Sequence, residues 1–164
     1  MAAIRRGGEH LLEIIGDVLN MARIETGRIT HEPRTFDLFK LLDELTSIFR
    51  QRAELKSLRF VVQRAPDLPP ALVGDEGKLR QILLNLLGNA VKFTFRGAVS
   101  LHVSWKDGIG RFVVADTGPG IPEAEQGRIF NPFVQTNTQQ NAREGTGLGL
   151  AICKKYLELM GGTI

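Results

Sequence analysis

Apolar residues near the start of the chain recur with the spacing of an amphipathic helix over residues 9–26. They follow one another at steps of four and three and form one broad stripe: Leu11, Leu12, Ile14, Ile15, Val18, Leu19 and Ala22. Gly27 comes directly after Thr26 as a stop signal. A stripe this wide has no partner nearby in the sequence. The pattern therefore predicts one helix of a hairpin or bundle whose other helix is missing.

Three more helices are predicted further along the chain. After a break at Pro33 and Thr35, residues 36–56 contain a helix with five inward positions: Leu41, Leu42, Leu45, Ile48 and Phe49. Residues 75–94 form a long helix and residues 148–160 a final one. Between them, residues 134–147 are rich in Gln, Asn and Thr and short of apolar anchors, which predicts a mobile loop.

Three strands are predicted between these helices. Residues 58–63 form one strand, which ends at a loop with three prolines. In residues 99–105 apolar positions alternate with Ser and His, so this strand has one solvated face. After the Asp107-Gly108 turn, residues 112–115 are continuously apolar, which predicts a central strand covered on both faces. This mixed order of elements predicts an α+β two-layer sandwich with hairpin-type connections.

The composition is typical of one soluble, cytoplasmic domain. The 164 residues are 43% hydrophobic and 24% charged, which excludes a disordered chain. Cys153 is the single cysteine, which excludes a disulfide scaffold and a zinc site built on cysteines. No apolar run approaches the ~18 residues that span a bilayer, and no signal-peptide core is present. The formal net charge is +3, but the basic residues are scattered, so no nucleic-acid partner is predicted.

The polar face of the helix at residues 75–94 is the first candidate site. Five polar residues fall within an arc of about 80 degrees, at about 100 degrees per residue: Lys78, Gln81, Asn85, Asn89 and Lys92. The other side of the helix carries the predicted core positions Leu79, Leu83, Leu86 and Ala90. Asn carbonyls can bind Mg²⁺, and a lysine one turn away can neutralise phosphate. The helix alone leaves open whether this face binds a ligand or is only solvated.

Two glycine-rich segments are further candidates. Asp116-Thr117-Gly118-Pro119-Gly120 follows a strand, where a carboxylate can accept a hydrogen bond from an exocyclic amine of a flat ring. An ordinary turn is the alternative for that segment. Gly145-Thr146-Gly147-Leu148-Gly149 precedes a helix, whose free N–H groups can bind an anion, although the Walker and dinucleotide signatures are absent. Together the three candidates predict a nucleotide pocket.

Four segments stand in an order that carries a family resemblance: residues 75–94, residues 116–121, Phe130-Asn131-Pro132-Phe133 and residues 145–149. In that order they resemble the N, G1, F and G2 boxes of sensor histidine kinases. Residues 21–27 are similar to the end of the second helix of the family's dimerisation hairpin. Four ordered boxes make a chance likeness very improbable. On this resemblance, residues 1–30 are part of the hairpin and residues 31–164 are the catalytic domain.

The resemblance implies the Bergerat ATP-binding fold, with ATP and Mg²⁺ as ligands. Asp116 would accept a hydrogen bond from the adenine N6 amine. The residues beside the ring would be Gly118, Gly120 and Ile121. Asn89 would coordinate Mg²⁺, Asn85 would be a second candidate ligand, and Lys92 would contact phosphate; these three would be the catalytic residues.

The resemblance also implies a lid at residues 134–144. Phe130 and Phe133 would anchor this lid, although plain core packing is an equal alternative for both. The triphosphate end would be closed by the residues of the G2 box: Gly145, Thr146, Gly147, Leu148 and Gly149.

The activity implied is transfer of the γ-phosphoryl group of Mg-ATP to a histidine outside this chain. The three histidines, His10, His31 and His102, lack the phosphoacceptor context, so self-phosphorylation is not expected. The family's final strands are also missing after Ile164, which predicts a C-terminally truncated domain. Implied partners are the kinase's own phosphoacceptor hairpin, a second copy through the hairpin helices, and the receiver domain of a response regulator. The full-length protein is expected either in the cytoplasm or tethered to the inner membrane.

Two other functions stay open. One is a hydrolytic ATPase of the wider superfamily, whose members carry a Glu general base one turn before the metal-binding Asn. The corresponding residue here is Asn85, which cannot take a proton from water at neutral pH, and this argues against hydrolysis. The other is an ATP-sensing or dimer-forming module that transfers no phosphate.

Overall fold

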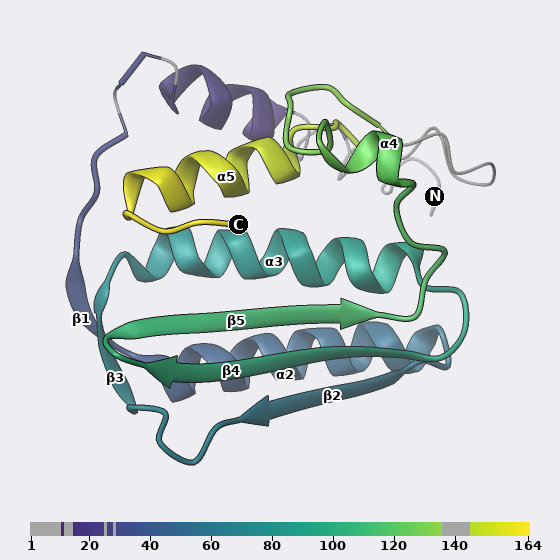
Figure 1. The fold of residues 1–164 in the computed structure, drawn as a ribbon, viewed down its shortest axis with the longest axis horizontal. Helices are drawn as coiled ribbons and strands as arrows, with labels where there is room; N and C mark the ends of the chain where they lie inside the picture. Colours follow the sequence, from purple (N-terminus) through teal and green to yellow (C-terminus); the bar gives the residue numbers. More distant parts are fainter. Residues whose placement is uncertain (1–10, 12–14, 25, 28, 136–144) are drawn as a thin grey trace. The chain divides into compact units, whose positions relative to one another are not determined.

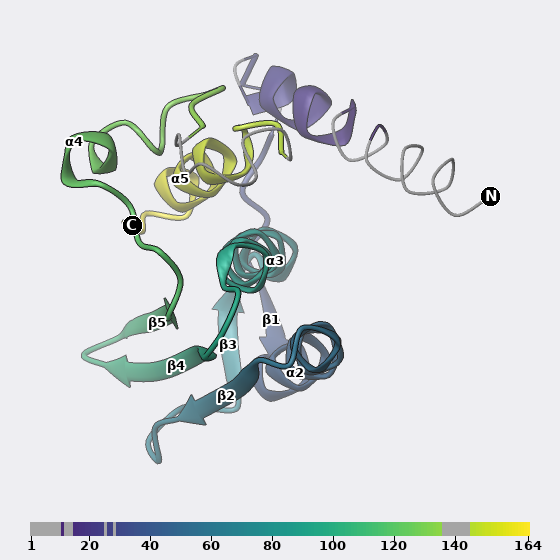
Figure 2. The same ribbon diagram turned by 90° about the vertical axis from the view of Figure 1, so that its right-hand side faces the viewer.

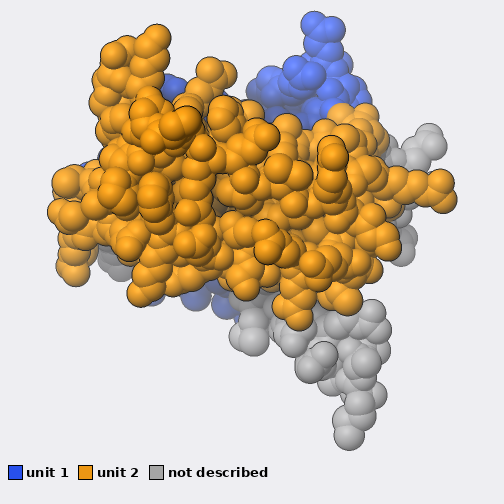
Figure 3. Space-filling view, turned by 90° about the horizontal axis from the view of Figure 1, so that it is seen from below, with its two compact units in different colours: residues 1–31, 121–164 blue, residues 32–120 orange. Residues whose placement is uncertain are grey.

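The computed structural model of the chain describes residues 11, 15–24, 26–27, 29–135 and 145–164. The chain divides into two compact units, coloured separately in Figure 3. One unit is residues 32–120, and the other combines residues 1–31 with residues 121–164. Most of the predicted lid and part of the first predicted helix lie outside the described residues.

The unit of residues 32–120 is a sandwich of helices on sheets. Its elements are β1 (Arg34–Asp37), α2 (Leu38–Leu55), β2 (Arg59–Arg64), β3 (Ala71–Gly74), α3 (Glu76–Phe93), β4 (Ala98–Lys106) and β5 (Ile109–Asp116). In the three-stranded sheet, β4 is central, parallel to β2 and antiparallel to β5, while β1 and β3 form a separate antiparallel pair. Figures 1 and 2 show α2 and α3 on the same face of the three-stranded sheet. The α+β sandwich expected from the sequence is confirmed for this unit.

Both long helices begin where an aspartate caps them. The Asp37 carboxylate accepts a hydrogen bond from the backbone N–H of Lys40 at 2.9 Å, and Asp75 accepts one from that of Lys78 at 3.1 Å. Such caps satisfy backbone donors that have no partner inside the helix. The helices then bury an apolar core against the sheet, made mainly of Leu38, Leu41, Leu42, Leu45, Phe49, Leu83, Leu87, Val99, Leu101 and Val103.

Three details of this unit differ from the sequence prediction. Ile48 is 38% exposed rather than inward, because the buried stripe of α2 runs through Leu45, Phe49 and Ala53. The short strands β1 and β3 were not predicted at all. Residues 112–115 do not form a central strand: among the described strands, β5 pairs only with β4, and Val113 is 37% exposed. Helices cover one face of this sheet, so only alternate residues of β5 pack inward.

The other unit contains helical residues 15–24, α4 (Glu123–Gln126) and α5 (Gly149–Leu159). Gly27 has φ of +64° and donates a hydrogen bond to the carbonyl oxygen of Ile24 at 3.0 Å, as expected of a stop signal. Four described residues of the predicted N-terminal stripe are about half exposed, namely Leu11, Ile15, Val18 and Leu19, and Ala22 is exposed as well. In the described part of the chain, no helix is long and apolar enough to cross a membrane.

Candidate functional site

Asn85, Asn89 and Lys92 share the half-buried face of α3 that the sequence predicts. The opposite face packs into the core through Leu83, Leu87, Ala90 and Val91. Of the four predicted core positions, Leu79 and Leu86 are only half-buried. The Gln81 side-chain amide donates to the Asn85 side-chain oxygen at 3.3 Å, which orients that carboxamide along the helix. The two Asn side chains therefore offer neutral oxygen ligands one turn apart.

Lys78 leaves this polar face and pairs with the helix cap. Its ammonium contacts Asp75 Oδ2, and both side chains are close to nine-tenths buried. Asp75 also accepts a hydrogen bond from the backbone N–H of Glu32 at 3.2 Å. Burial alone would raise the pKa of the Asp75 carboxyl, but the hydrogen bonds from Lys78 and Glu32 and the Lys78 charge lower it below its usual value. Lys78 thus stabilises the start of α3 rather than extending the candidate phosphate face.

Asp116 is the last residue of β5 and lies beside the C-terminal end of α3. Its Oδ1 atom accepts a hydrogen bond from the Gly118 N–H at 2.7 Å and lies 3.5 Å from the Thr94 hydroxyl. Thr94 is fully buried, and its hydroxyl donates to the carbonyl oxygen of Ala90 at 2.7 Å. Both contacts of the carboxylate end on the same oxygen, which fixes how the group is turned.

Gly118 has little room for a side chain. A Cβ atom there would lie 2.7 Å from Asp116 Oδ1 and 3.2 Å from the carbonyl oxygen of Phe93. Gly120 has φ of +73°, a conformation that favours glycine. The segment is also tied to the sheet, because the Thr117 hydroxyl accepts from the Ala98 N–H at 3.0 Å and donates to a neighbouring carbonyl. Residues 116–120 therefore form a turn in which two glycines leave the backbone beside Asp116 without side chains.

The G2 box packs against the F box within the other unit. Gly147 has φ of +69°, and a Cβ atom there would lie 2.9 Å from the backbone carbon of Phe133. Its carbonyl oxygen accepts a hydrogen bond from the Phe133 N–H at 3.0 Å. The Thr146 hydroxyl accepts from the Leu148 N–H at 3.0 Å and donates to Asp17 Oδ2 at 2.9 Å. Side-chain and backbone hydrogen bonds therefore fix the segment from Gly145 to Gly149, where α5 begins.

The two aromatic residues of the F box differ in burial. Phe133 is 71% exposed and has φ of +63°, so the core-packing alternative is wrong for this residue. Phe130 is half-buried in a groove of about 170 Å³ with Met21, Pro132, Ala151, Lys154 and Glu158 among its lining residues. Ile121 is 39% exposed.

The candidate residues fall into two sets, one in each compact unit. Asn85, Asn89, Lys92, Asp116, Gly118 and Gly120 belong to residues 32–120, and the other eight belong to the second unit. The sequence did not point to Thr94 and Asp17, whose side chains contact candidate residues. A single threonine after a helix carries no recognisable signal, and Asp17 lies between apolar stripe residues outside any motif.

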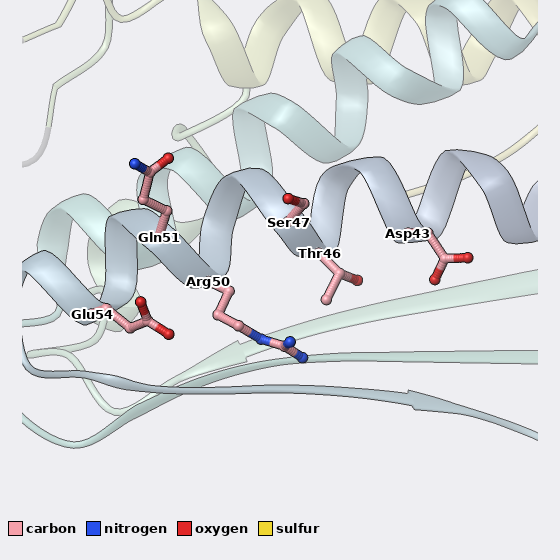
Figure 4. A pocket seen from close by; sticks show the side chains of 6 residues that line it. All are labelled: Asp43, Thr46, Ser47, Arg50, Gln51 and Glu54. Carbon is pink, nitrogen blue, oxygen red and sulfur yellow. The ribbon is translucent and has the colours of Figure 1, made fainter.

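A second hollow, of about 360 Å³, is lined by six polar residues of α2 and contains no candidate residue (Figure 4).

No group of three or more His, Cys, Asp or Glu side chains that could hold a metal is found among the described residues. A cation near α3 would therefore rely on carboxamide oxygens together with oxygens of the ligand itself. This donor set fits Mg²⁺, which keeps few protein ligands and binds substrate phosphates and water.

Comparison with known proteins gives the family. Residues 74–164 match the family described as histidine kinase-, DNA gyrase B-, and HSP90-like ATPase. Sensor histidine kinase RcsC of Escherichia coli (strain K12) is 39% identical over 165 residues, which cover 100% of this chain and 17% of RcsC. The chain thus spans about a sixth of the length of that curated relative.

Solved structures agree with this comparison. The crystal structure of full-length ShkA in complex with AMPPNP matches with a TM-score of 0.85 and 42% identity, over 98% of this chain and 33% of ShkA. Histidine kinase ThkA in complex with the response regulator protein TrrA matches with a TM-score of 0.73 and 25% identity, over 98% of this chain and 43% of that one. The chain belongs to the histidine kinase, DNA gyrase B and HSP90-like ATPase family and is an ATP-binding catalytic domain of the sensor histidine kinase type.

Proposed function

We propose that the chain binds Mg-ATP and transfers the γ-phosphoryl group to a histidine of a phosphoacceptor hairpin. The observation that supports this most is the packing of Asp116 and Gly118 against the end of α3. That packing places an acceptor for an exocyclic amine beside a backbone that a flat ring can approach, and Lys92 lies in the last turn of the same helix. These are the features that recognition of an adenine nucleotide needs.

At the adenine end, Asp116 accepts the N6 amine hydrogen bond. Its Oδ1 atom already accepts the Gly118 N–H at 2.7 Å, so Oδ2 is the oxygen that we assign to the amine. Gly118 and Gly120 let the ring lie against the backbone, and Ile121 covers its edge. AMPPNP, an ATP analogue, occupies the related ShkA, which supports an adenine nucleotide as the ligand here.

At the phosphate end, Asn89 and Asn85 supply carboxamide oxygens and Lys92 supplies a positive charge. Mg²⁺, when bound, neutralises charge on the phosphates and holds them in line for transfer. Asn89 is the direct ligand and Asn85 the supporting one, because Asn85 Oδ1 is already engaged by Gln81. Lys92 orients the phosphates and neutralises them.

The G2 box completes the triphosphate end in this proposal. Helix α5 begins at Gly149, and the helix dipole at such an N-terminus favours an anion. Thr146 and Leu148 fix that terminus, and Phe130 and Phe133 stand directly before residues 134–144, which we propose as the lid.

The partners proposed follow from the N-terminal helix. Residues 1–30 are the second helix of a dimerisation hairpin and residues 31–164 the catalytic domain. The exposed apolar side chains at Ile15, Val18 and Leu19 support a helix that packs against other helices, in its own hairpin and in a second copy. A receiver domain is the proposed acceptor of the phosphoryl group from the hairpin, as the complex of ThkA with TrrA suggests. Because ATP is the donor, we place the reaction in the cytoplasm.

Hydrolysis of ATP is the weaker candidate. The Asn85 carboxamide cannot act as a general base towards water, and no carboxylate shares its face of α3. Transfer to a histidine needs no such base on this helix.

The test supplies the missing acceptor in trans. The chain is incubated with γ-labelled Mg-ATP and a separately purified phosphoacceptor hairpin of a related kinase, and acid-labile label on the hairpin is measured. Label on the hairpin, absent with the Asn89→Ala variant, is expected. ATP binding without any label on the hairpin would leave only an ATP-sensing module, and steady release of phosphate would favour hydrolysis.

A further inference from the structure

The side chain of Lys56 spans from the end of α2 to the end of α3. Its backbone N–H donates to the carbonyl oxygen of Ala53 at 3.0 Å and ends α2. Its ammonium donates to the carbonyl oxygens of Val91 at 2.8 Å, Lys92 at 2.7 Å and Thr94 at 3.5 Å. The last carbonyls of a helix have no partner inside it, and a positive charge there is favourable. One residue therefore ends α2 with its backbone and α3 with its side chain.

The turn that Lys56 closes carries the contacts of Asp116. Thr94, whose carbonyl oxygen Lys56 reaches, places its buried hydroxyl 3.5 Å from Asp116 Oδ1. The carbonyl oxygen of Phe93, in the same turn, would lie 3.2 Å from a Cβ on Gly118. The backbones of Gly118 and Phe93 thus approach so closely that a Cβ would have little room between them, and packing this close transmits a displacement because it leaves no free space to absorb it. A shift in the end of α3 therefore changes how the Asp116 carboxylate is held.

The ammonium of Lys56 is also held from a second side. It lies 5.8 Å from the centre of the Phe95 ring, within the range of a cation–π contact. Three carbonyl oxygens and one ring fix the charge at one point, although the residue is exposed at the surface. A lysine that is merely solvated makes no such set of contacts.

We propose that Lys56 is a positioning residue for adenine recognition. By closing the last turn of α3, it holds Thr94 and Phe93 against Asp116 and Gly118 and so directs the carboxylate at the exocyclic amine. It contacts neither ligand nor reacting atoms and acts only through α3. The proposal rests on the proposed function, because it assumes that Asp116 receives the amine of adenine.

The test compares nucleotides that differ at that amine. Guanine carries a carbonyl oxygen where adenine carries the amine, so the ratio of the Kd for GTP to the Kd for ATP reports on the Asp116 contact. Calorimetry measures this ratio for the wild type, Lys56→Met and Lys56→Arg. We expect the ratio to fall about five- to tenfold in K56M, since charge-assisted hydrogen bonds are lost, and to stay within about twofold of the wild type in K56R.

Arg80→Met is the matched control. Arg80 of α3 also joins α3 to α2, through Glu44 at 2.7 Å, and pairs with Glu76 of its own helix at 2.7 Å, but near the opposite end of α3. Loss of general stability would lower both affinities in both variants and leave the ratio unchanged. We therefore expect the ratio to change in K56M and not in R80M.

An unchanged ratio in K56M, or an equal fall in R80M, overturns the proposal. If K56M does not fold, Lys56→Gln, whose shorter and uncharged amide cannot replace the ammonium on three carbonyl oxygens, gives the same measurement, and a ratio equal to that of the wild type overturns the proposal as well. A wild type that binds neither nucleotide refutes the proposed function itself. A wild type that binds ATP without preference over GTP leaves the proposed function standing but refutes the role of Lys56.

Discussion

Replacement of Asp116 by Asn tests the adenine contact most directly. The change keeps the size of the side chain and replaces one carboxylate oxygen by an NH₂ group. In the wild type, Oδ1 accepts the Gly118 N–H at 2.7 Å and Oδ2 is assigned to the adenine amine. The amide has one oxygen and cannot serve both donors, so whichever way it turns, an NH₂ group faces an N–H.

The expected loss of ATP affinity follows from this count of donors and acceptors. One hydrogen bond disappears and one buried donor is left unsatisfied in the complex, which costs about 1–3 kcal/mol. At 1.4 kcal/mol per factor of ten, the Kd for ATP should rise roughly five- to 150-fold. The free protein should change little, because the amide can turn its oxygen towards Gly118.

Titration calorimetry with Mg-ATP measures this change. Asp107→Asn is the matched control, since Asp107 lies in the exposed turn between β4 and β5 with φ of +52°, a conformation that Asn tolerates well. We expect D107N to bind ATP as the wild type does. An unchanged Kd in D116N, with the fold intact by circular dichroism, would refute the assignment of Asp116 to adenine.

Three further predictions concern α3 and the N-terminal helix. Lys92→Ala should weaken Mg-ATP binding about tenfold while adenosine binding stays unchanged; calorimetry with both ligands tests this, and equal loss of both would place Lys92 outside the phosphate site. Asp75→Ala should lower the free energy of unfolding by about 1–2 kcal/mol at pH 7. Because the folded-state pKa of Asp75 lies below its usual 3.8, that difference should persist above about pH 4 and disappear as the pH falls through the folded-state pKa, as urea unfolding would show; a difference independent of pH would contradict it. Concentration-dependent self-association should weaken in the double variant Ile15→Gln, Leu19→Gln, because burial of each exposed apolar side chain contributes up to about 1.5–3 kcal/mol. Sedimentation velocity that shows equal association of the wild type and the double variant would exclude this stripe as the contact.

The long elements could be predicted because their signals are local. Helix α3 begins at Glu76 after its Asp75 cap and ends at Phe93, and the polar face with Asn85, Asn89 and Lys92 follows from the period of the helix alone. Strand β4 was equally clear, since Val99, Leu101 and Val103 are all buried as the alternation requires. The roles of these residues came from the resemblance rather than from the pattern.

The parts that were missed depend on distant partners. Strand β1 has four residues and exists only because it pairs with β3, as in the register of Thr35 with Val73. Neither strand carries an alternation long enough to be recognised. The prediction that β5 is covered on both faces was wrong for a related reason. An apolar run indicates that some of its side chains are buried, but it does not show whether a second layer covers the other face. In the structure Val113 of β5 is 37% exposed.

The pairing of the F and G2 boxes has a consequence for the length of the chain between them. Phe133 donates to the Gly147 carbonyl at 3.0 Å, and the Gln135 side chain donates to that of Gly145 at 2.8 Å, so Gln135 and Gly145 are held close together. Once the ends of a loop are fixed in this way, doubling its length costs only about 0.6 kcal/mol of closure entropy. Insertions or deletions between Gln135 and Gly145 should therefore be tolerated far better than any change of length within α3.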